Sequence, residues 1–274
     1  MLEIVDFRAR TLNLSSIQVS WAIAPTPEDV LDYRFQVLRA EGPEGPWQEM
    51  TGPFVDRYLF LDNFPEPFNF GRPLHYRLRV QHAVTLAVKE FGPALVDEEP
   101  DLIALEVRRH WDVTLYELNG RRCWLFPART FGTTCKACYD KITQRVTASR
   151  CEQCYGTGYA RGFHHPVEMW MKVDPTPKLN NATGAVVSQL GATRAYLGAF
   201  PRVKQKDLIV EPNNRRWRVA SVESTERLRA ILHQAITLVE CAPGDIEMDV
   251  PVVVSDLETL ALAAERNYKY RLTV

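Results

Sequence analysis

The sequence predicts a mainly β protein with two β-rich parts and a cysteine-rich segment between them, and three observations predict it. Short alternating apolar segments, separated by proline and glycine turns, fill residues 1–95. A second series of alternating segments begins at residue 166. Between the two series, four of the six cysteines lie in one 20-residue window. A chain of 274 residues is long enough for two or three domains, each with its own core.

Residues 1–95 are expected to form a β-sandwich. Four segments alternate between apolar and polar side chains, which is the period of a half-buried strand. They are Ser16–Trp21, Tyr33–Leu38, Tyr58–Leu61 and His75–Val80. Turn-forming prolines and glycines lie between them. Short strands at this spacing are typical of a β-sandwich.

The same part of the chain resembles a fibronectin type III domain. The resemblance is carried by Val19-Ser-Trp21, Tyr33–Arg39, Gly45-Pro-Trp47 and Tyr76–Val80. In that family a tryptophan of the second strand fills the core, and a tyrosine of a later strand makes a corner hydrogen bond. Trp21 and Tyr76 match those two positions. The resemblance implies a spacer or adhesive module, and a fold of this kind gives no chemistry by itself.

A helix is expected at the start of the next part, residues 96–130. The acidic run Asp97–Glu99 and Pro100 suit a helix start. Apolar side chains then recur at helical spacing at Ile103, Val107 and Trp111.

A β-hairpin is expected after this helix. Two alternating segments, Val113–Leu118 and Arg121–Phe126, flank Asn119 and Gly120. Asn-Gly tolerates the positive φ angles of a two-residue hairpin turn. The hairpin would lead directly into the cysteine-rich segment.

The four clustered cysteines form two C-x-x-C pairs separated by 12 residues. They are Cys135, Cys138, Cys151 and Cys154. Two residues between thiols let both sulfurs of a tight turn point at one centre, and two such turns complete the tetrahedral thiolate site that zinc prefers. We therefore expect residues 131–165 to fold as a zinc ribbon with a structural zinc ion.

This zinc ion is expected to stabilise the fold without catalysis, because four thiolates leave no open position for water. Free or disulfide-paired thiols are the first alternative. The second is that His164 or His165, close downstream, replaces one cysteine ligand.

Residues 166–274 are expected to form a small antiparallel barrel followed by a C-terminal helix and strand. The predicted strands are Val167–Val173, Asp207–Val210, Arg216–Val222 and Ala235–Val239, with a loop at Asn180–Gly184. A capping-box sequence opens a helix from Ser255 to Arg266. The last segment, Tyr268–Val274, alternates as a strand, and we hypothesise that it pairs with another subunit; pairing within its own chain is the alternative.

Composition and motifs narrow the function classes. The net charge of −1 argues against a protein that binds nucleic acid along its whole length. No apolar run approaches the roughly 20 residues of a membrane helix. The first residues, Met1–Arg10, lack the pattern of a signal peptide. Phosphate-loop, nucleophile-elbow and metalloprotease motifs are absent from the sequence, so the protein is not expected to be an enzyme. The alternative in that class is a hydrolase that uses His164, His165 and Glu168.

A basic stretch favours a further alternative, a zinc-ribbon nucleic-acid-binding protein. Seven cations lie between residues 194 and 218: Arg194, Arg202, Lys204, Lys206, Arg215, Arg216 and Arg218. Such a patch attracts phosphates, and Trp217 would be available to stack on a base. A solvated face of alternating strands explains the same pattern.

The second half of the chain resembles structural proteins of tailed-bacteriophage virions. Phe131-Gly132, the double cysteine turn, Cys154–Tyr159 and Gly162 are similar to zinc-bearing virion proteins. Phe200–Val210, Asn214–Val219 and Ala220–Val222 are similar to the head-closure barrels of the phage neck.

This second resemblance implies a neck, or head-to-tail connector, protein that forms a homo-oligomeric ring and docks other virion proteins. The implied partners are portal or adaptor and tail proteins, with non-specific contact to DNA in the ring's channel as a further option and no membrane contact. The implied location is the virion, assembled in the host cytoplasm. A baseplate or tail-hub adaptor is the alternative within the same class.

Overall fold

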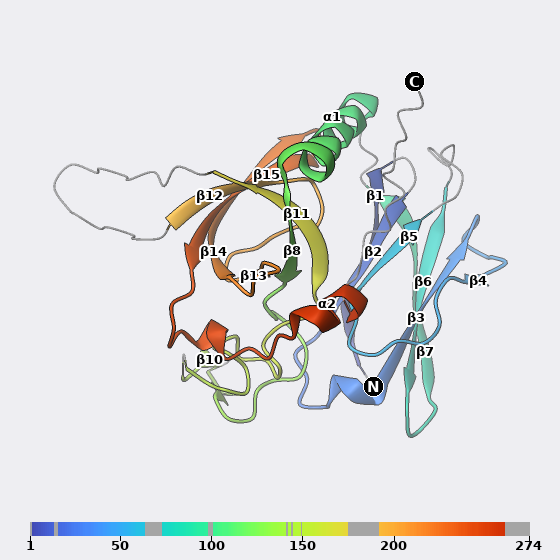
Figure 1. The fold of residues 1–274 in the computed structure, drawn as a ribbon. Helices are drawn as coiled ribbons and strands as arrows, with labels where there is room; N and C mark the ends of the chain where they lie inside the picture. The colour runs from blue at the N-terminus through green and yellow to red at the C-terminus, as the bar shows by residue number, and fades with distance from the viewer. Residues whose placement is uncertain are drawn as a thin grey trace. The chain divides into compact units, whose positions relative to one another are not determined.

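The computed structural model describes residues 2–13, 16–63, 73–97, 101–140, 142–143, 145–148, 150–174 and 192–260. Strands dominate these residues, so the predicted mainly β class is confirmed (Figure 1). The chain divides into two compact units. The first unit comprises residues 1–101 and 129–164, and the second comprises residues 102–128 and 165–274.

This division cuts across the expected segments 1–95, 96–130, 131–165 and 166–274. The cysteine-rich segment is an insertion within the barrel sequence, but it belongs to the first unit together with the N-terminal sheet. Of residues 96–130, for which a helix and a β-hairpin were expected, residues 102–128 belong to the second unit.

One seven-stranded sheet forms the body of the first unit, in the order β4-β3-β6-β7-β1-β2-β5. Its strands are β1 (Ile4–Asn13), β2 (Ser16–Ile23), β3 (Tyr33–Ala40), β4 (Gln48–Glu49), β5 (Leu59–Asn63), β6 (His75–His82) and β7 (Val88–Asp97). Neighbouring strands are antiparallel except for β1 and β7, which make a short parallel contact.

The sheet of the first unit folds over on itself. Strands β2 and β3 are four places apart, about 19 Å in a flat sheet. The rings of Trp21 on β2 and Phe35 on β3 nevertheless lie 5.9 Å apart. Both side chains belong to one buried cluster that also holds Tyr33 and Tyr76. The two halves of the sheet therefore enclose a common core, in which Trp21 is 3% exposed.

Tyr76, which was expected to make a corner hydrogen bond, donates its hydroxyl to Asp62 Oδ2 at 2.7 Å. Arg39 Nη1 donates to the same oxygen at 2.9 Å. The partner of the tyrosine is thus a buried carboxylate at the end of β5, held in place by an arginine of β3.

A closed six-stranded barrel forms the body of the second unit, in the order β11-β12-β15-β14-β13-β8. Its strands are β8 (Arg121–Phe126), β11 (Val167–Val173), β12 (Ala192–Leu197), β13 (Leu208–Val210), β14 (Arg216–Arg227) and β15 (Ala230–Glu240). Every pair of neighbours is antiparallel. The predicted small antiparallel barrel is confirmed, and β8 is one of its strands.

The barrel encloses an apolar core with one buried amide. Alternate residues of the strands point inward, among them Cys123, Met169, Met171, Ile209, Trp217, Ile236 and Leu238. Gln234 is fully buried, and its Nε2 donates to the carbonyls of Gly198 and Pro201. Its Oε1 accepts the N–H of Val203. The amide thereby fastens the loop between β12 and β13, with each of its polar atoms paired.

The expected hairpin around Asn119-Gly120 is wrong, because the chain is helical up to Asn119. Helix α1 (Leu102–Val113) continues into the π-helical turn η2 (Thr114–Asn119). Gly120 has φ −84°, and its N–H donates to Leu115 O at 3.0 Å. A Cβ at Gly120 would lie 2.1 Å from that oxygen. The glycine is required for a close backbone approach at a helix end, not for a hairpin turn.

The buried face of α1 also differs from the expected one. Ile103 is 58% exposed, whereas Ala104, Leu105 and Arg108 are buried. Arg108 Nε donates to the carbonyl of Ile231 at 2.6 Å, which fastens α1 to β15. The apolar periodicity of the sequence does not include arginine, although the long apolar stem of this side chain packs well under a helix.

The remaining helical segments of the described residues are short: η1 (Val30–Asp32), η3 (Ile246–Met248) and α2 (Val254–Leu260). The helix expected from Ser255 to Arg266 is present as α2 up to Leu260. Its remainder, the expected loop Asn180–Gly184 and the expected strand Tyr268–Val274 lie outside the described residues. Among the described residues, none of the helices has the length and apolarity needed to cross a membrane.

Candidate metal centre

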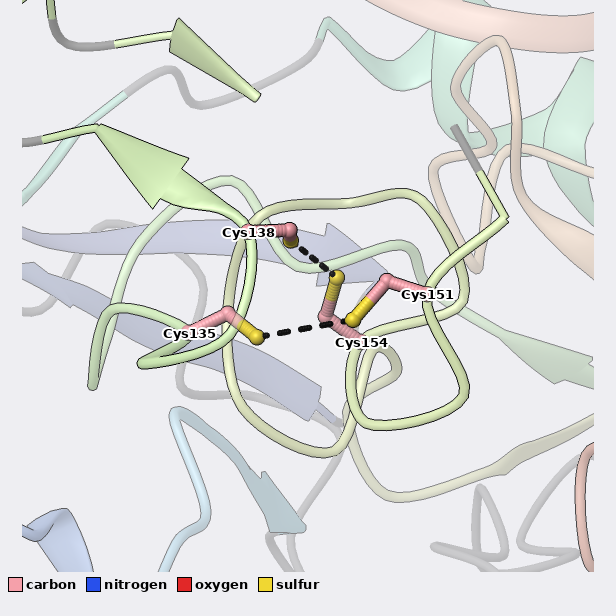
Figure 2. Close-up of side chains that lie close together, drawn as sticks. All are labelled: Cys135, Cys138, Cys151 and Cys154. Atoms are coloured by element: carbon pink, nitrogen blue, oxygen red, sulfur yellow. Dashed lines mark hydrogen bonds between the residues drawn. The ribbon is translucent and has the colours of Figure 1, made fainter. Parts of the chain in front are cut away.

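The four clustered cysteines lie on two tight turns joined by a small hairpin. Cys135 and Cys138 precede strand β9 (Tyr139–Asp140), which pairs with β10 (Arg145–Val146) before the turn that holds Cys151 and Cys154. The 12-residue spacer thus contains the short hairpin that its length allows. Figure 2 shows the four side chains converging from the two turns.

The four sulfur atoms lie within 4.8 Å of one another. Cys135 Sγ is 3.8 Å from Cys151 Sγ, and Cys138 Sγ is 3.2 Å from Cys154 Sγ. A tetrahedral ion with metal–sulfur bonds of about 2.3 Å holds its ligands about 3.8 Å apart. A disulfide would need about 2.05 Å, and all four thiols are free. The donor set and its spacing are therefore close to those of a single four-coordinate metal ion.

Backbone amides favour the thiolate form of cysteines in the second turn, whereas burial disfavours a thiolate unless a cation neutralises its charge. The four cysteines are between 0% and 8% exposed. Burial raises the pKa of the Cys151 thiol, but the N–H of Gln153 and the neighbouring thiols outweigh it and lower the pKa to about 7. Burial likewise raises the pKa of Cys154, against hydrogen bonds from the amides of Gly156 and Gly158. Amides directed at sulfur stabilise the thiolate form that binds metal.

Glycines shape the second turn. Gly156 and Gly158 have φ +79° and +84°, in the left-handed region. A Cβ at Gly158 would lie 2.6 Å from Val146 Cγ2, and one at Gly162 would lie 2.8 Å from Cys154 O. The glycine run that follows the fourth cysteine is thus needed both for backbone conformation and for close packing.

A buried ion pair joins the cysteine-rich segment to the N-terminal sheet. Arg129 Nη1 and Nη2 donate to the two carboxylate oxygens of Asp56, at 3.0 and 2.5 Å. Arg129 Nε donates to Phe163 O at 2.9 Å, so one guanidinium holds both ends of the segment. The side chains of Arg129 and Asp56 are 2% and 7% exposed. These residues were not predicted from the sequence, because they lie 73 positions apart and belong to no motif.

Backbone and ring contacts extend this attachment. The N–H of Thr134 donates to Thr26 O, and the N–H of Thr26 donates to Gly132 O. Phe131 and His164 flank the ring of Tyr58, with ring centroids 4.9 and 5.3 Å from it. Both ends of the cysteine-rich segment therefore pack on the N-terminal sheet, within the first unit.

The residues considered for hydrolysis have structural partners inside their own units. His164, in the first unit, lies in the aromatic cluster with Tyr58 and Phe131. Glu168, in the second unit, accepts a hydrogen bond from Arg122 Nε on the neighbouring strand β8 and is 7% exposed. His165 is the first residue of the later stretch of the second unit, residues 165–274.

Trp217, expected to be available for stacking on a base, is 3% exposed and lies inside the barrel. Its Nε1 donates to Glu211 Oε1 at 2.7 Å. Side chains of a barrel strand point alternately into the barrel and out of it, and the alternation of β14 directs Trp217 inward. The proposed stacking role of Trp217 is therefore wrong.

Four arginines of the basic stretch have partners in the second unit. Arg194 pairs with Glu223, Arg215 with Glu240 and Arg218 with Glu247. Arg216 is buried, and its Nη1 donates to the carbonyls of Glu247, Met248 and Val250. Most of the arginine charge in this stretch is thus used within the fold, which weakens its case as a phosphate-binding patch.

Two partly or fully buried carboxylates of the second unit were missed. Asp207 is 1% exposed and accepts N–H groups from Ala128 and Lys204, and burial raises its pKa to about 6. Burial raises the pKa of Asp112, near the end of α1, to about 7. Asp207 ties the end of β8 to the loop before β13, which is a structural role.

Comparison with protein-family models gives no match to this chain. No curated protein is similar to it in sequence either.

Proposed function

We propose that the four cysteines hold one zinc ion that braces the fold. The observation that carries this proposal is the convergence of four buried thiols from two turns, with backbone amides directed at Cys151 and Cys154. Thiolates select soft metals such as zinc, copper(I) and iron–sulfur clusters, and four thiolates around one centre suit zinc. When bound, the ion supplies charge neutralisation and a crosslink between the two turns.

The sulfurs complete the coordination of such an ion, so its role is structural. Cys135 and Cys138 fix the start of the segment, and Cys151 and Cys154 fix its end. Arg129 then connects this crosslinked segment to the N-terminal sheet through Asp56. Zinc binding would in this way stabilise the whole first unit, and not only the cysteine turns.

We propose further that the protein is a non-catalytic structural component of a tailed-phage virion, in a ring at the neck. The proposal rests on the sequence resemblance to zinc-bearing virion proteins and head-closure barrels. The closed barrel and the rigid metal-braced segment are consistent with a part that acts by packing and docking. Copies of the chain, portal or adaptor proteins and tail proteins are the proposed partners, and the virion is the proposed location.

The experiment that tests this role has two stages. The purified protein is examined by mass photometry and negative-stain electron microscopy, where closed rings of uniform size are expected. Particles from a lysate of the strain that encodes the chain are then purified and analysed by mass spectrometry, where the protein is expected at a fixed copy number. A protein that stays monomeric and is missing from purified particles would contradict the proposal.

The same particles separate the neck from the baseplate. Antibody labelling against the N-terminal sheet is expected at the junction of head and tail. Labelling at the distal end of the tail would instead favour the baseplate or tail-hub adaptor.

A further inference from the structure

The hairpin formed by β14 and β15 runs beyond the body of the barrel. The two strands pair from Trp217 and Glu240 to Arg227 and Ala230, whereas β13 pairs with β14 only over Arg216–Arg218. Past that point β14 has a partner strand on only one side among the described residues. The segment Ser221–Glu226 is therefore an edge strand within an otherwise closed barrel.

The two sides of this hairpin differ in what covers them. Helix α1 packs along β15 (Figure 1). Arg108 of α1 donates to the carbonyl of Ile231 on this strand. On the other side, no backbone group of the described residues pairs with the outer edge of Ser221–Glu226. Along this edge every second residue directs its N–H and C=O outward, which is a template for an added strand.

The side chains of this edge define which strand it would accept. Val222 packs against the barrel core and shares its face of the strand with the exposed Ser224 and Glu226, and on the opposite face Glu223 is exposed. The Glu223 side chain is 70% exposed, although Arg194 approaches its Oε2 to 2.7 Å. Two copies of this edge would bring glutamates together, which disfavours self-pairing. A strand with apolar side chains on one face and cations on the other is complementary.

The segment Tyr268–Val274 has this pattern. Tyr268, Tyr270, Leu272 and Val274 alternate with Lys269 and Arg271. As a strand, its apolar face would continue that of Val222, and its cations would lie beside Glu223. The segment is seven residues long, against six in the open edge. The seven residues between Leu260 and Tyr268 span about 23 Å when extended, which limits how far from α2 the second molecule can lie.

We propose that Tyr268–Val274 of one copy of the chain adds a strand to the outer edge of Ser221–Glu226 in a second copy. Lys269 and Arg271 of the first copy then lie next to Glu223 of the second. Donor and acceptor are different surfaces of one chain, so the contact is head-to-tail and can close into a ring. This inference rests on the part of the proposed function that has the chain self-associate into a ring, and it does not require that the ring belong to a virion.

The experiment is a charge exchange in the full-length chain. Glu223→Lys alone, and Lys269→Glu with Arg271→Glu, each place like charges at the contact and are expected to weaken self-association at least about tenfold. The variant with all three changes restores opposite charges and is expected to recover most of the affinity. Association is measured by sedimentation velocity over a concentration series, and circular dichroism checks that each variant is folded.

Glu240→Lys is the matched control. Glu240 is an exposed glutamate of the same barrel that pairs with Arg215, as Glu223 pairs with Arg194, but it lies away from the open edge. Its substitution is expected to leave association unchanged. A Glu223→Lys variant that associates like the control, or a triple variant without recovery, would overturn the proposal. A wild-type chain that stays monomeric throughout the series would overturn it as well, because the strand then has no second copy to join.

A proteolysis measurement separates this contact from pairing within one chain. In the proposed assembly, cleavage after Arg271 by trypsin is expected to be slow at high protein concentration and fast upon dilution. Protection that does not depend on concentration shows that the segment pairs within its own chain, which contradicts the proposal. Neither measurement involves phage particles, so the proposed strand contact and the proposed virion role can fail independently of each other.

Discussion

Substitution of Arg129 by methionine tests how the cysteine-rich segment is connected to the N-terminal sheet. The change removes a bidentate pair with Asp56 and leaves the carboxylate of this side chain, which is 7% exposed, without its main partner. Breaking a buried pair in this way typically costs about 3–5 kcal/mol. Arg161 Nη2 remains 3.5 Å from Asp56 Oδ2 and offsets part of the loss. We therefore expect a decrease of about 3 kcal/mol in the free energy of opening of the segment.

The assay is native-state hydrogen exchange of the amides between Phe131 and Phe163, because local opening is measured there without unfolding both units. Arg8→Met is the matched control in the same unit. Arg8 also donates to an aspartate, Asp6, at 2.6 Å, but the two side chains are 52% and 47% exposed. An exposed pair contributes about 0–1 kcal/mol, so this variant should exchange almost like the wild type.

A double variant with Asp56→Asn completes the test. Asp56 has φ +56°, a conformation that asparagine tolerates, so this change removes the charge with little backbone strain. The double variant is expected to lose less stability than the two single variants added together. An Arg129→Met variant that exchanges like Arg8→Met, or additive losses, would refute the idea that this pair attaches the segment to the sheet.

Three further predictions concern the turns, a buried carboxylate and the basic stretch. Gly158→Ala places a Cβ 2.6 Å from Val146 Cγ2 at a residue with a positive φ. The variant protein is expected to release zinc to a chelator at least about tenfold faster than the wild type, which corresponds to about 1.4 kcal/mol or more. An unchanged release rate would contradict the packing argument. Asp112→Asn is expected to stabilise the protein above pH 7, by up to about 4 kcal/mol, and to have little effect below pH 4. The native pKa of Asp112, about 7, lies above its ordinary value of 3.8, so wild-type stability falls as the pH rises between the two values. A variant whose melting curve equals that of the wild type at pH 8 as well as at pH 4 would disprove this. Elution from a heparin column is expected at low salt, because the arginines of the basic stretch are paired within the fold; retention that falls steeply with salt would favour the nucleic-acid-binding alternative.

Regular alternation made most strands predictable. An observed strand contains or matches each of four predicted segments, because apolar and polar residues alternate along them: Ser16–Trp21, Tyr33–Leu38, His75–Val80 and Val167–Val173. Strand β7 was missed because Gly92 and Pro93 interrupt it, and both residues are usually turn signals. Strand β1 was missed because arginines and aspartate dilute its pattern.

The wrong hairpin shows where local patterns fail. Val113–Leu118 has the composition of a strand, and Asn119-Gly120 is a strong turn signal. Leu115 is buried in the structure, and the helix that starts at Leu102 continues through it. Packing of a helix outweighed the intrinsic preference of its last residues for β structure, and this packing is not visible in a local window of sequence.

The candidate site was predictable to the extent that its chemistry is local. The spacing of the cysteines places all four sulfurs within reach of one centre, and the structure brings them together. The attachment through Asp56 and Arg129 was not predictable, because it depends on how two distant segments meet. The same applies to the open edge of β14, which exists because β13 is only three residues long.

Metal analysis of the purified protein tests the central claim most directly. Native mass spectrometry of the folded protein and elemental analysis by inductively coupled plasma mass spectrometry are each expected to give one zinc ion per chain. Thiol titration after metal removal is expected to find four newly reactive cysteines, Cys135, Cys138, Cys151 and Cys154. A folded protein without metal, or with these cysteines in disulfides, would contradict the account.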